Sequence, residues 1–241
     1  KMNVSPEEAD HPDRDRFLLS AGHKCLAQYA ALAEKGYFAK EVMDTYGALG
    51  SKIPGHPDMH KLPGVEANTG ALGHGLSIAA GMAMAAKLER RGYKVYAICG
   101  DGELPEGSNW EAAAAAAKFG LDNLVVFVDN NELQISGQVT EVMNMEPIAG
   151  KFAAFGWAVA KIDGNDMEEI VKMLDRLPIE RGKPTLILCH TVKAKGLSFG
   201  ENQAGYHFWN ATEELLRQAE EEMEARAEEL RQEMEAVAYD G

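Results

Sequence analysis

The 241-residue sequence is short of positive charge. Its 24 lysines and arginines are outnumbered by 38 aspartates and glutamates, for a formal net charge of −14. This imbalance argues against non-specific binding to nucleic acid or to an anionic membrane surface. A phosphorylated ligand therefore needs local dipoles, a metal ion or a few histidines to hold it. No apolar run is long enough to cross a bilayer, and the first residues do not resemble a signal peptide.

Cysteine is also scarce. The chain has three cysteines, Cys25, Cys99 and Cys189, an odd number without a C-x-x-C pair. Cys99 and Cys189 end β-rich apolar runs, where small buried hydrophobic side chains are expected. We interpret all three as buried residues of a protein in the reducing cytoplasm, rather than as catalytic or metal-binding groups.

Apolar runs of strand length alternate with helical patterns along the chain. Three runs are continuous, at 94–99, 123–129 and 184–190, and shorter or weaker runs lie at 17–20 and 157–162. Helical patterns cover 24–36, 75–92, 106–119 and 166–177, and Gly92 is expected to cap the second of them. Continuous apolar strands between helices predict an α/β fold with a parallel sheet covered on both faces.

These patterns predict one α/β domain over residues 1–211 and an acidic C-terminal helix over 212–241. Apolar residues spaced by threes and fours form a stripe along that helix, namely Leu216, Ala219, Met223, Ala227, Leu230, Met234 and Val237. The stripe packs either on its own domain or on a partner subunit, and the sequence does not distinguish the two.

A Gly-Asp-Gly turn at 100–102 follows one apolar run, and Asp129-Asn130-Asn131 ends the next. A right-handed crossover between two parallel strands places Asp101 and Asn131 at the same edge of the sheet, where open α/β sheets bind ligands. A carboxylate, an amide oxygen and a loop carbonyl make half of an octahedral oxygen shell for a divalent cation. Two diphosphate oxygens and a water would complete that shell, so the cation explains an aspartate in a phosphate-binding turn.

Two other interpretations of this turn exist. A dinucleotide-binding fold needs G-x-G-x-x-G directly after a strand, whereas the sequence here is G-D-G-E-L-P-E-G, without the third glycine in register. A simple tight turn with a helix cap is common, but the paired D-N-N one βαβ unit later favours a metal–diphosphate site.

Gly-Asp-Gly followed about thirty residues later by Asn-Asn resembles the thiamine diphosphate signature. The surrounding segments resemble transketolase over most of residues 13–207, and they read DRDRFLLSAGHKCLAQYAAL, HKLPGVEANTGALGHGLSIAAGMAMAAK, GDGELPEGSNWEAA and VDNNELQISGQV. The match is to the diphosphate-binding domain in its form as a separate N-terminal subunit. This resemblance implies a thiamine-diphosphate-binding fold and transfer of a two-carbon ketol unit from a ketose, usually phosphorylated, to an aldose.

The resemblance also implies which residues hold the cofactor. Asp101, Asn131 and the carbonyl of Leu133 resemble the ligands of Mg²⁺ or of Ca²⁺ or Mn²⁺, and the backbone N–H of Gly102 resembles a diphosphate contact. Other matches to cofactor-contacting positions are Gly70, Leu72, Asn131, Ile135 and His207.

Three histidines match the family's catalytic positions. His23 and His56 resemble histidines that line the pocket near the reactive carbon and the donor sugar, and His207 resembles a diphosphate-binding histidine. His207 lies in a segment, YHFWN, that departs from the usual WHGKAP-like pattern. His74 stands where full-length transketolases usually carry glutamine, and it either contacts ligand or caps the helix that follows.

Glu106 and Glu111 precede a run of six alanines. Acidic residues at a helix N-terminus are favourable without any further role. In the family, glutamates here lie at a subunit contact and link two cofactor sites through waters. Small side chains would let two such helices approach closely, although an alanine run is also simply a good helix.

The resemblance accounts for only half of an active site. In the family a second domain supplies the glutamate that activates the aminopyrimidine ring, and nothing after residue 207 is long enough to be that domain. We expect a separate C-terminal subunit with the pyrimidine-binding and C-terminal domains, in a heterotetramer of two plus two chains that self-associates through this domain. Family members have run several dozen residues before the position of Lys1, so we expect an incomplete N-terminus.

Two alternatives keep the same motifs. The chain could belong to another thiamine diphosphate enzyme, such as a 2-oxo-acid dehydrogenase component or a deoxyxylulose phosphate synthase, but LPGVEANTGALGHG favours transketolase. It could also be a non-catalytic cofactor-binding or scaffolding subunit. The intact Asp101, Asn131 and His23 argue against such a decayed site.

Overall fold

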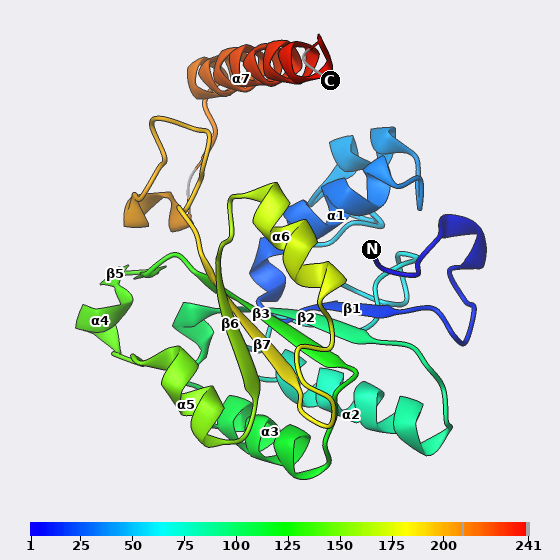
Figure 1. Ribbon diagram of the computed structural model, residues 1–241. Coiled ribbons are helices and arrows are strands. Elements are labelled where there is room, and N and C mark those ends of the chain that lie inside the picture. Colours follow the sequence, from blue (N-terminus) through cyan, green and yellow to red (C-terminus); the bar gives the residue numbers. More distant parts are fainter. Residues whose placement is uncertain (209, 240–241) are drawn as a thin grey trace.

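The computed structural model describes residues 1–208 and 210–239, with the side chains of 236–239 left aside. Five parallel strands form its central sheet in the order β1-β2-β3-β7-β6 (Figure 1). They are β1 (Arg16–Leu19), β2 (Val95–Gly100), β3 (Leu124–Asn130), β7 (Thr185–His190) and β6 (Ala158–Asp163). Each predicted apolar run forms one of these strands, so the predicted parallel sheet is confirmed.

Helices cover both faces of the sheet (Figure 1). One face carries α2 (Gly75–Leu88), α3 (Gly107–Lys118) and α5 (Ile148–Ala154). The other face carries α1 (Cys25–Glu34) and α6 (Met167–Asp175). Successive strand residues point to opposite faces, and both must be apolar because both are covered. This explains why the strands read as continuous apolar runs.

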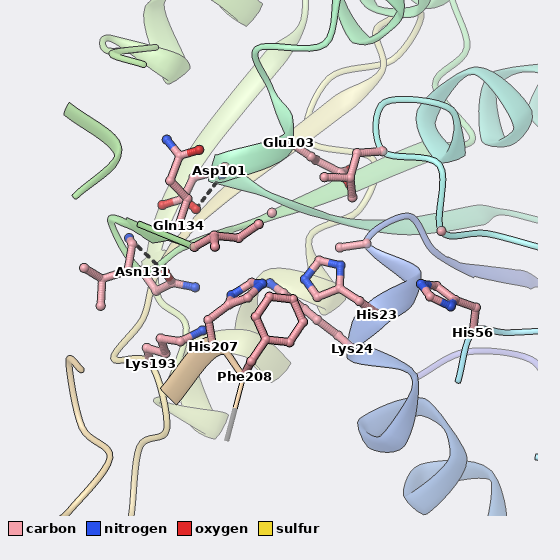
Figure 2. A pocket seen from close by; sticks show the side chains of 17 residues that line it. His23, Lys24, His56, Asp101, Glu103, Asn131, Gln134, Lys193, His207 and Phe208 are labelled. Atoms are coloured by element: carbon pink, nitrogen blue, oxygen red, sulfur yellow. Dashed lines mark hydrogen bonds between the residues drawn. The ribbon is translucent and has the colours of Figure 1, made fainter. Parts of the chain in front are cut away.

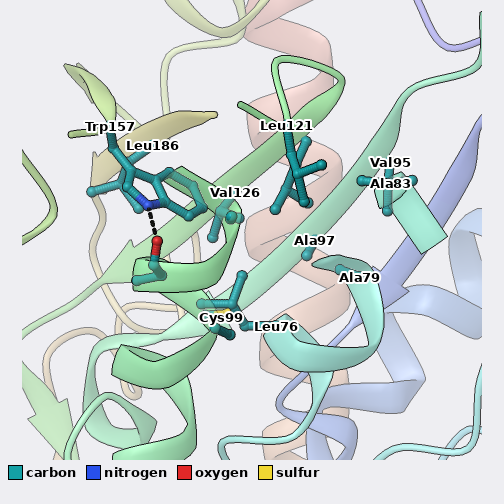
Figure 3. Packing of buried hydrophobic residues seen from close by; sticks show 14 of the residues in the cluster. Leu76, Ala79, Ala83, Val95, Ala97, Cys99, Leu121, Val126, Trp157 and Leu186 are labelled. Atoms are coloured by element: carbon teal, nitrogen blue, oxygen red, sulfur yellow. Dashed lines mark hydrogen bonds between the residues drawn. The ribbon is translucent and has the colours of Figure 1, made fainter. Parts of the chain in front are cut away.

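The larger core lies between the sheet and the α2–α3–α5 layer (Figure 3). Alternate β2 residues Val95, Ala97 and Cys99 pack there against small residues of α2 such as Ala79 and Ala83. The indole N–H of Trp157 donates to the carbonyl of Ala113 at 2.8 Å, which ties the start of β6 to α3. All three cysteines are free and buried, as expected.

The strand register aligns the carboxyl ends of β2, β3 and β7 at one edge of the sheet. Gly100 at the end of β2 lies beside Asp129 of β3, and Asp129 lies beside Cys189 of β7. The Gly-Asp-Gly turn and the Asp-Asn-Asn segment therefore leave the sheet at the same edge, as the βαβ argument predicts.

Several local features differ from the sequence expectations. Helix α2 ends at Leu88 rather than near Gly92, because Arg90 takes the left-handed conformation (φ 57°) and the Arg91 N–H donates to the Ala86 carbonyl at 2.8 Å. Gly92 is therefore not its cap. The sequence patterns also missed three short elements, the hairpin of β4 (Leu133–Gln134) and β5 (Gly137–Gln138), α4 (Val139–Val142) and α5.

The acidic helix α7 (Glu213–Tyr239) extends away from the body of the fold (Figure 1). Its apolar stripe is largely exposed: Leu216 is 49% and Met223 62% exposed, and the side chain of Val237 lies outside the described residues. Glu222 joins it to the body by accepting hydrogen bonds from Ser198. Within the described residues no helix is both long and apolar enough to cross a membrane.

Candidate active site

A cavity of about 340 Å³ opens at the carboxyl edge of the sheet (Figure 2). Its walls come from segments far apart in the sequence, including the 3₁₀ helix Gly22–Lys24, the end of β2, the β4 strand and the 3₁₀ helix Ala204–His207. All residues predicted to be catalytic, to bind cofactor or to bind metal line it, namely His23, His56, Gly70, Leu72, Asp101, Gly102, Asn131, Leu133, Ile135 and His207.

Asp101 is a buried carboxylate of the cavity, with 2% of its surface exposed. Its Oδ1 accepts a hydrogen bond from the N–H of Gly102 and its Oδ2 one from the N–H of Glu132, both at 2.7 Å. Burial raises the pKa of Asp101 to about 6, against the lowering effect of these two hydrogen bonds. A positive charge beside this carboxylate would stabilise its ionised form.

The oxygen donors around Asp101 fit a hard divalent cation. Asn131 is only 9% exposed, and its Oδ1 accepts from the Leu133 N–H at 3.0 Å, leaving a second lone pair on that oxygen. Among the described residues no group of three or more His, Cys, Asp or Glu side chains has metal-site geometry. A carboxylate, an amide oxygen and a backbone carbonyl are the oxygen ligands that Mg²⁺ or Ca²⁺ accepts, and they suit zinc poorly.

Gly102 lies against the β4 strand. A Cβ at this position would lie 2.9 Å from the Cβ of Gln134, so the close approach requires glycine. Its N–H donates to Asp101 in the structure. A diphosphate oxygen at this N–H, as the family resemblance implies, would therefore compete with Oδ1 of Asp101 for the same donor.

The histidines stand on the opposite wall of the cavity (Figure 2). The rings of His23 and His207 have centroids 5.2 Å apart. Partial burial, and then the nearby His207 and Lys24, lower the pKa of His23 to about 4. His56 packs on Gly70, where a Cβ would lie 2.6 Å from its ring and where φ is +145°. Glycine at position 70 therefore makes room for the His56 ring.

Two lysines in the cavity were missed by the sequence analysis. Lys24 forms an ion pair with Asp129, and burial, followed by the nearby Lys24 charge, lowers the pKa of Lys193. No sequence motif identifies either lysine. In the case of Lys24, the partner Asp129 lies 105 positions away in the sequence, so their contact cannot be seen in a local pattern. Lys24 stands within one of the transketolase-like segments, but only the fold shows where its ammonium goes. Buried Glu103 also lines the cavity, and it too was overlooked.

The two glutamates predicted at a subunit contact lie outside the cavity. Glu106 precedes α3 as its N-cap, with its Cβ against Gly73. Glu111 borders a shallow hollow between α2 and α3 that is lined by small residues such as Ala80, Gly81 and Ala115. Their interface role stays a prediction.

His74 is neither a cavity residue nor a side-chain cap. It is the N-cap residue of α2 without a side-chain capping bond, and its Nδ1 lies 3.1 Å from the Leu72 carbonyl. Of the two roles considered for it, the position at the N-cap of α2 is therefore the one that the structure bears out, and His74 does not line the cavity.

Comparison with known proteins gives a consistent result. The family model described as transketolase, thiamine diphosphate binding domain, matches residues 1–233. The chain is 45% identical over 232 residues to an apulose-4-phosphate transketolase subunit of Phocaeicola vulgatus, covering 96% of this chain and 82% of the relative. It is 43% identical over 223 residues to the 6-deoxy-6-sulfo-D-fructose transketolase subunit SqwG of a Clostridium species, covering 92% and 81%.

Full-length transketolases are longer than this chain. The chain is 38% identical to the transketolase of Geobacillus stearothermophilus, matching 86% of itself but only 32% of that protein. It superposes on the crystal structure of Campylobacter jejuni transketolase with a TM-score of 0.86 and 36% identity, covering 91% of this chain and 36% of that one. The chain thus corresponds to about one third of a single-chain enzyme and to most of a separate subunit.

Proposed function

Because the chain belongs to the family of transketolase thiamine diphosphate-binding domains, we propose that it is the N-terminal subunit of a split transketolase. In this proposal it moves a two-carbon ketol unit from a ketose, usually phosphorylated, to an aldose in the cytoplasm, together with a separate C-terminal subunit. The observation that carries the proposal is the convergence of Asp101, Asn131 and three histidines on one cavity at the carboxyl edge of the sheet.

In this proposal the diphosphate of the cofactor binds at the carboxyl edge of the sheet. Asp101, Asn131 and the Leu133 carbonyl would hold Mg²⁺, whose charge would stabilise the ionised carboxylate and attract the diphosphate. The N–H of Gly102 would donate to a diphosphate oxygen. When bound, thiamine diphosphate supplies the electron sink that allows a carbon–carbon bond next to a carbonyl to break and form.

The side of the cavity formed by His23, His56 and His207 would face the donor sugar. With its pKa lowered to about 4, His23 is neutral at pH 7. Its ring then has one N–H donor and one acceptor nitrogen, which suits sugar hydroxyls and the transfer of a proton to or from a hydroxyl oxygen. His207 and the Lys193 ammonium stand beside it and would hold negative charge on the diphosphate or on a sugar phosphate.

The rest of the active site would come from a second chain. Relatives of matching length are named as transketolase subunits, which implies a partner chain for each of them. We propose two copies of each chain, with the domain self-associating through the α2–α3 face that carries Glu106 and Glu111. Apolar side chains at the cavity mouth, Ile135 at 61% and Phe208 at 73% exposed, would then be covered by the partner.

The test is a reconstitution assay. The purified chain with thiamine diphosphate and Mg²⁺ is expected to show negligible ketol transfer, and addition of the partner chain is expected to restore turnover. The assay should run across several phosphorylated ketose donors with coupled detection of the aldehyde product. Robust turnover by this chain alone would contradict the proposed division of the active site.

A further inference from the structure

Asp129 connects three segments next to the cavity, where it contacts the lining residues Lys24 and Asn131, although it was not among the predicted site residues. It is the next-to-last residue of β3, beside Gly100 of β2 and Cys189 of β7. Its Oδ2 accepts from the Lys24 ammonium and, at 3.1 Å, from the Nδ2 of Asn131. Its Oδ1 accepts from the hydroxyl of Thr191, which follows β7. The carboxylate is thus held by donors from the start of α1, the end of β3 and the end of β7.

These contacts fix the orientation of the Asn131 amide. An amide has an oxygen end and an N–H₂ end of nearly the same shape, and only hydrogen-bond partners decide which way it points. Asp129 accepts from the nitrogen end, and the Leu133 N–H donates to the oxygen end at 3.0 Å. The oxygen therefore faces away from Asp129, toward the position proposed for the cation.

Lys24 and Thr191 keep Asp129 in this role. Their two donors and the Asn131 amide together occupy both carboxylate oxygens. The Lys24 charge also neutralises Asp129, whose side chain is 27% exposed. A free carboxylate at this point would compete with the Asn131 amide for a hard cation. Because Lys24 and Thr191 already engage it, the hydrogen bond from Nδ2 of Asn131 is the contact by which it orients the proposed ligand.

We propose that Asp129, clamped by Lys24 and Thr191, is a positioning residue that holds the Asn131 amide with its oxygen toward the metal. The inference rests on the proposed function, which assigns Asn131 to the cation. Partners of metal ligands of this kind typically change metal affinity by about 10- to 100-fold when they are removed.

The test measures metal binding on the full chain. Mn²⁺ replaces Mg²⁺ in the presence of thiamine diphosphate, and the electron paramagnetic resonance signal of free Mn²⁺ gives its affinity. The variants are Asp129→Ala and the milder Thr191→Val. The matched control is Asp122→Ala, which also breaks a lysine–aspartate pair (to Lys87, 2.6 Å) and a hydrogen bond from a backbone N–H, but outside the cavity.

A second readout follows the amide itself. The side-chain ¹H–¹⁵N signals of Asn131, assigned by their loss in Asn131→Asp, are recorded without metal. We expect a slowly exchanging, shifted N–H in the wild-type chain that is lost in Asp129→Ala. The exchanged pair, Asp129→Asn with Asn131→Asp, restores a donor opposite an acceptor and is expected to recover Mn²⁺ affinity relative to Asp129→Ala.

Each outcome bears on the proposal. Support requires Mn²⁺ affinity about 10- to 100-fold weaker in Asp129→Ala, a smaller loss in Thr191→Val, and no loss in Asp122→Ala. Wild-type affinity in Asp129→Ala, or an equal loss in the control, overturns the positioning role while the proposed function stands. If Asp129→Ala does not fold, an unchanged Asn131 signal and Mn²⁺ affinity in Thr191→Val overturn it instead. Absence of Mn²⁺ binding in the wild type overturns the metal site itself and the inference with it.

Discussion

Replacing Gly102 by alanine tests how closely the Gly-Asp-Gly turn is built against the β4 strand. An alanine Cβ at this position would lie 2.9 Å from the Cβ of Gln134 and 3.8 Å from its Cα. Carbon atoms in contact prefer about 3.5 to 4.0 Å, so the two segments must separate by roughly 0.6 Å or more. The obstructing atom is attached directly to the β4 backbone, so no side-chain rotation relieves the contact. Overpacking of this kind costs about 1 to 3 kcal/mol of unfolding free energy.

The displaced strand also carries part of the proposed cation site. Strand β4 begins at Leu133, whose N–H holds the Oδ1 of Asn131 at 3.0 Å. We therefore expect Gly102→Ala to lower the melting temperature of the chain by about 2 to 12 °C. We also expect weaker binding of thiamine diphosphate with Mg²⁺, measured by isothermal titration calorimetry. Both effects have the same cause, movement of β4 away from the turn.

Two further variants separate this cause from a general effect of alanine. Gly107→Ala at the first residue of α3 meets no atom within 4 Å, and alanine in a helix is favoured over glycine by about 0.5 to 1 kcal/mol. The double variant Gly102→Ala with Gln134→Gly removes the obstructing Cβ, and it should recover cofactor affinity relative to Gly102→Ala. The reasoning is refuted if Gly102→Ala melts and binds as the wild type does, or if the double variant recovers nothing.

Three other predictions follow from the same structure. Asp101→Ala should abolish Mg²⁺-dependent binding of thiamine diphosphate in calorimetric titration, and unchanged affinity would remove the metal assignment. His23 should titrate near pH 4 by NMR, because burial and then the charges of His207 and Lys24 lower its pKa to about 4. Since this pKa lies below the unfolded value, the folded state should become less stable as the pH falls from 6.5 toward 4. A titration midpoint above pH 6 would contradict the burial of His23 in the cavity. Deletion of residues 213–241 should change the free energy of unfolding by less than about 1 kcal/mol, because the hydrogen bonds of Glu222 and Gln218 that hold α7 to the body go to the exposed residue Ser198, where such contacts contribute little. A large drop in melting temperature would show that α7 packs on its own domain.

The sheet could be predicted from the sequence because its strands are covered on both faces. Because of this burial each strand is a continuous apolar run, and such a run can be recognised in one sequence without an alignment. The β4–β5 hairpin has strands of two residues each, too short to show any period. Arg90 in place of Gly92 at the end of α2 was equally unpredictable, since a positive φ on arginine is a local exception.

Some residues of the candidate site could likewise be predicted from the sequence, and others could not. Asp101 and Asn131 follow from topology, because parallel strands bring their carboxyl ends to one edge. The three histidines came from the family resemblance alone, since no spacing rule joins positions 23, 56 and 207. Lys24 and Asp129 were missed by both arguments. Their pairing depends on where α1 begins relative to β3, which only the folded chain specifies.

The chain's acidity, the first feature of its sequence, is distributed so that it spares the cavity. Helix α7 contains ten glutamates and three arginines, a formal charge of −7 and thus half of the chain's −14. That helix projects away from the sheet (Figure 1), and charges beyond about one Debye length, about 8 Å at physiological ionic strength, are largely screened. Within the cavity the carboxylates Asp101 and Glu103 lie with Lys24, which is paired with Asp129, and with Lys193, and Asp101 would be neutralised by a cation. An anionic cofactor therefore meets a local charge balance less negative than the net charge of the chain.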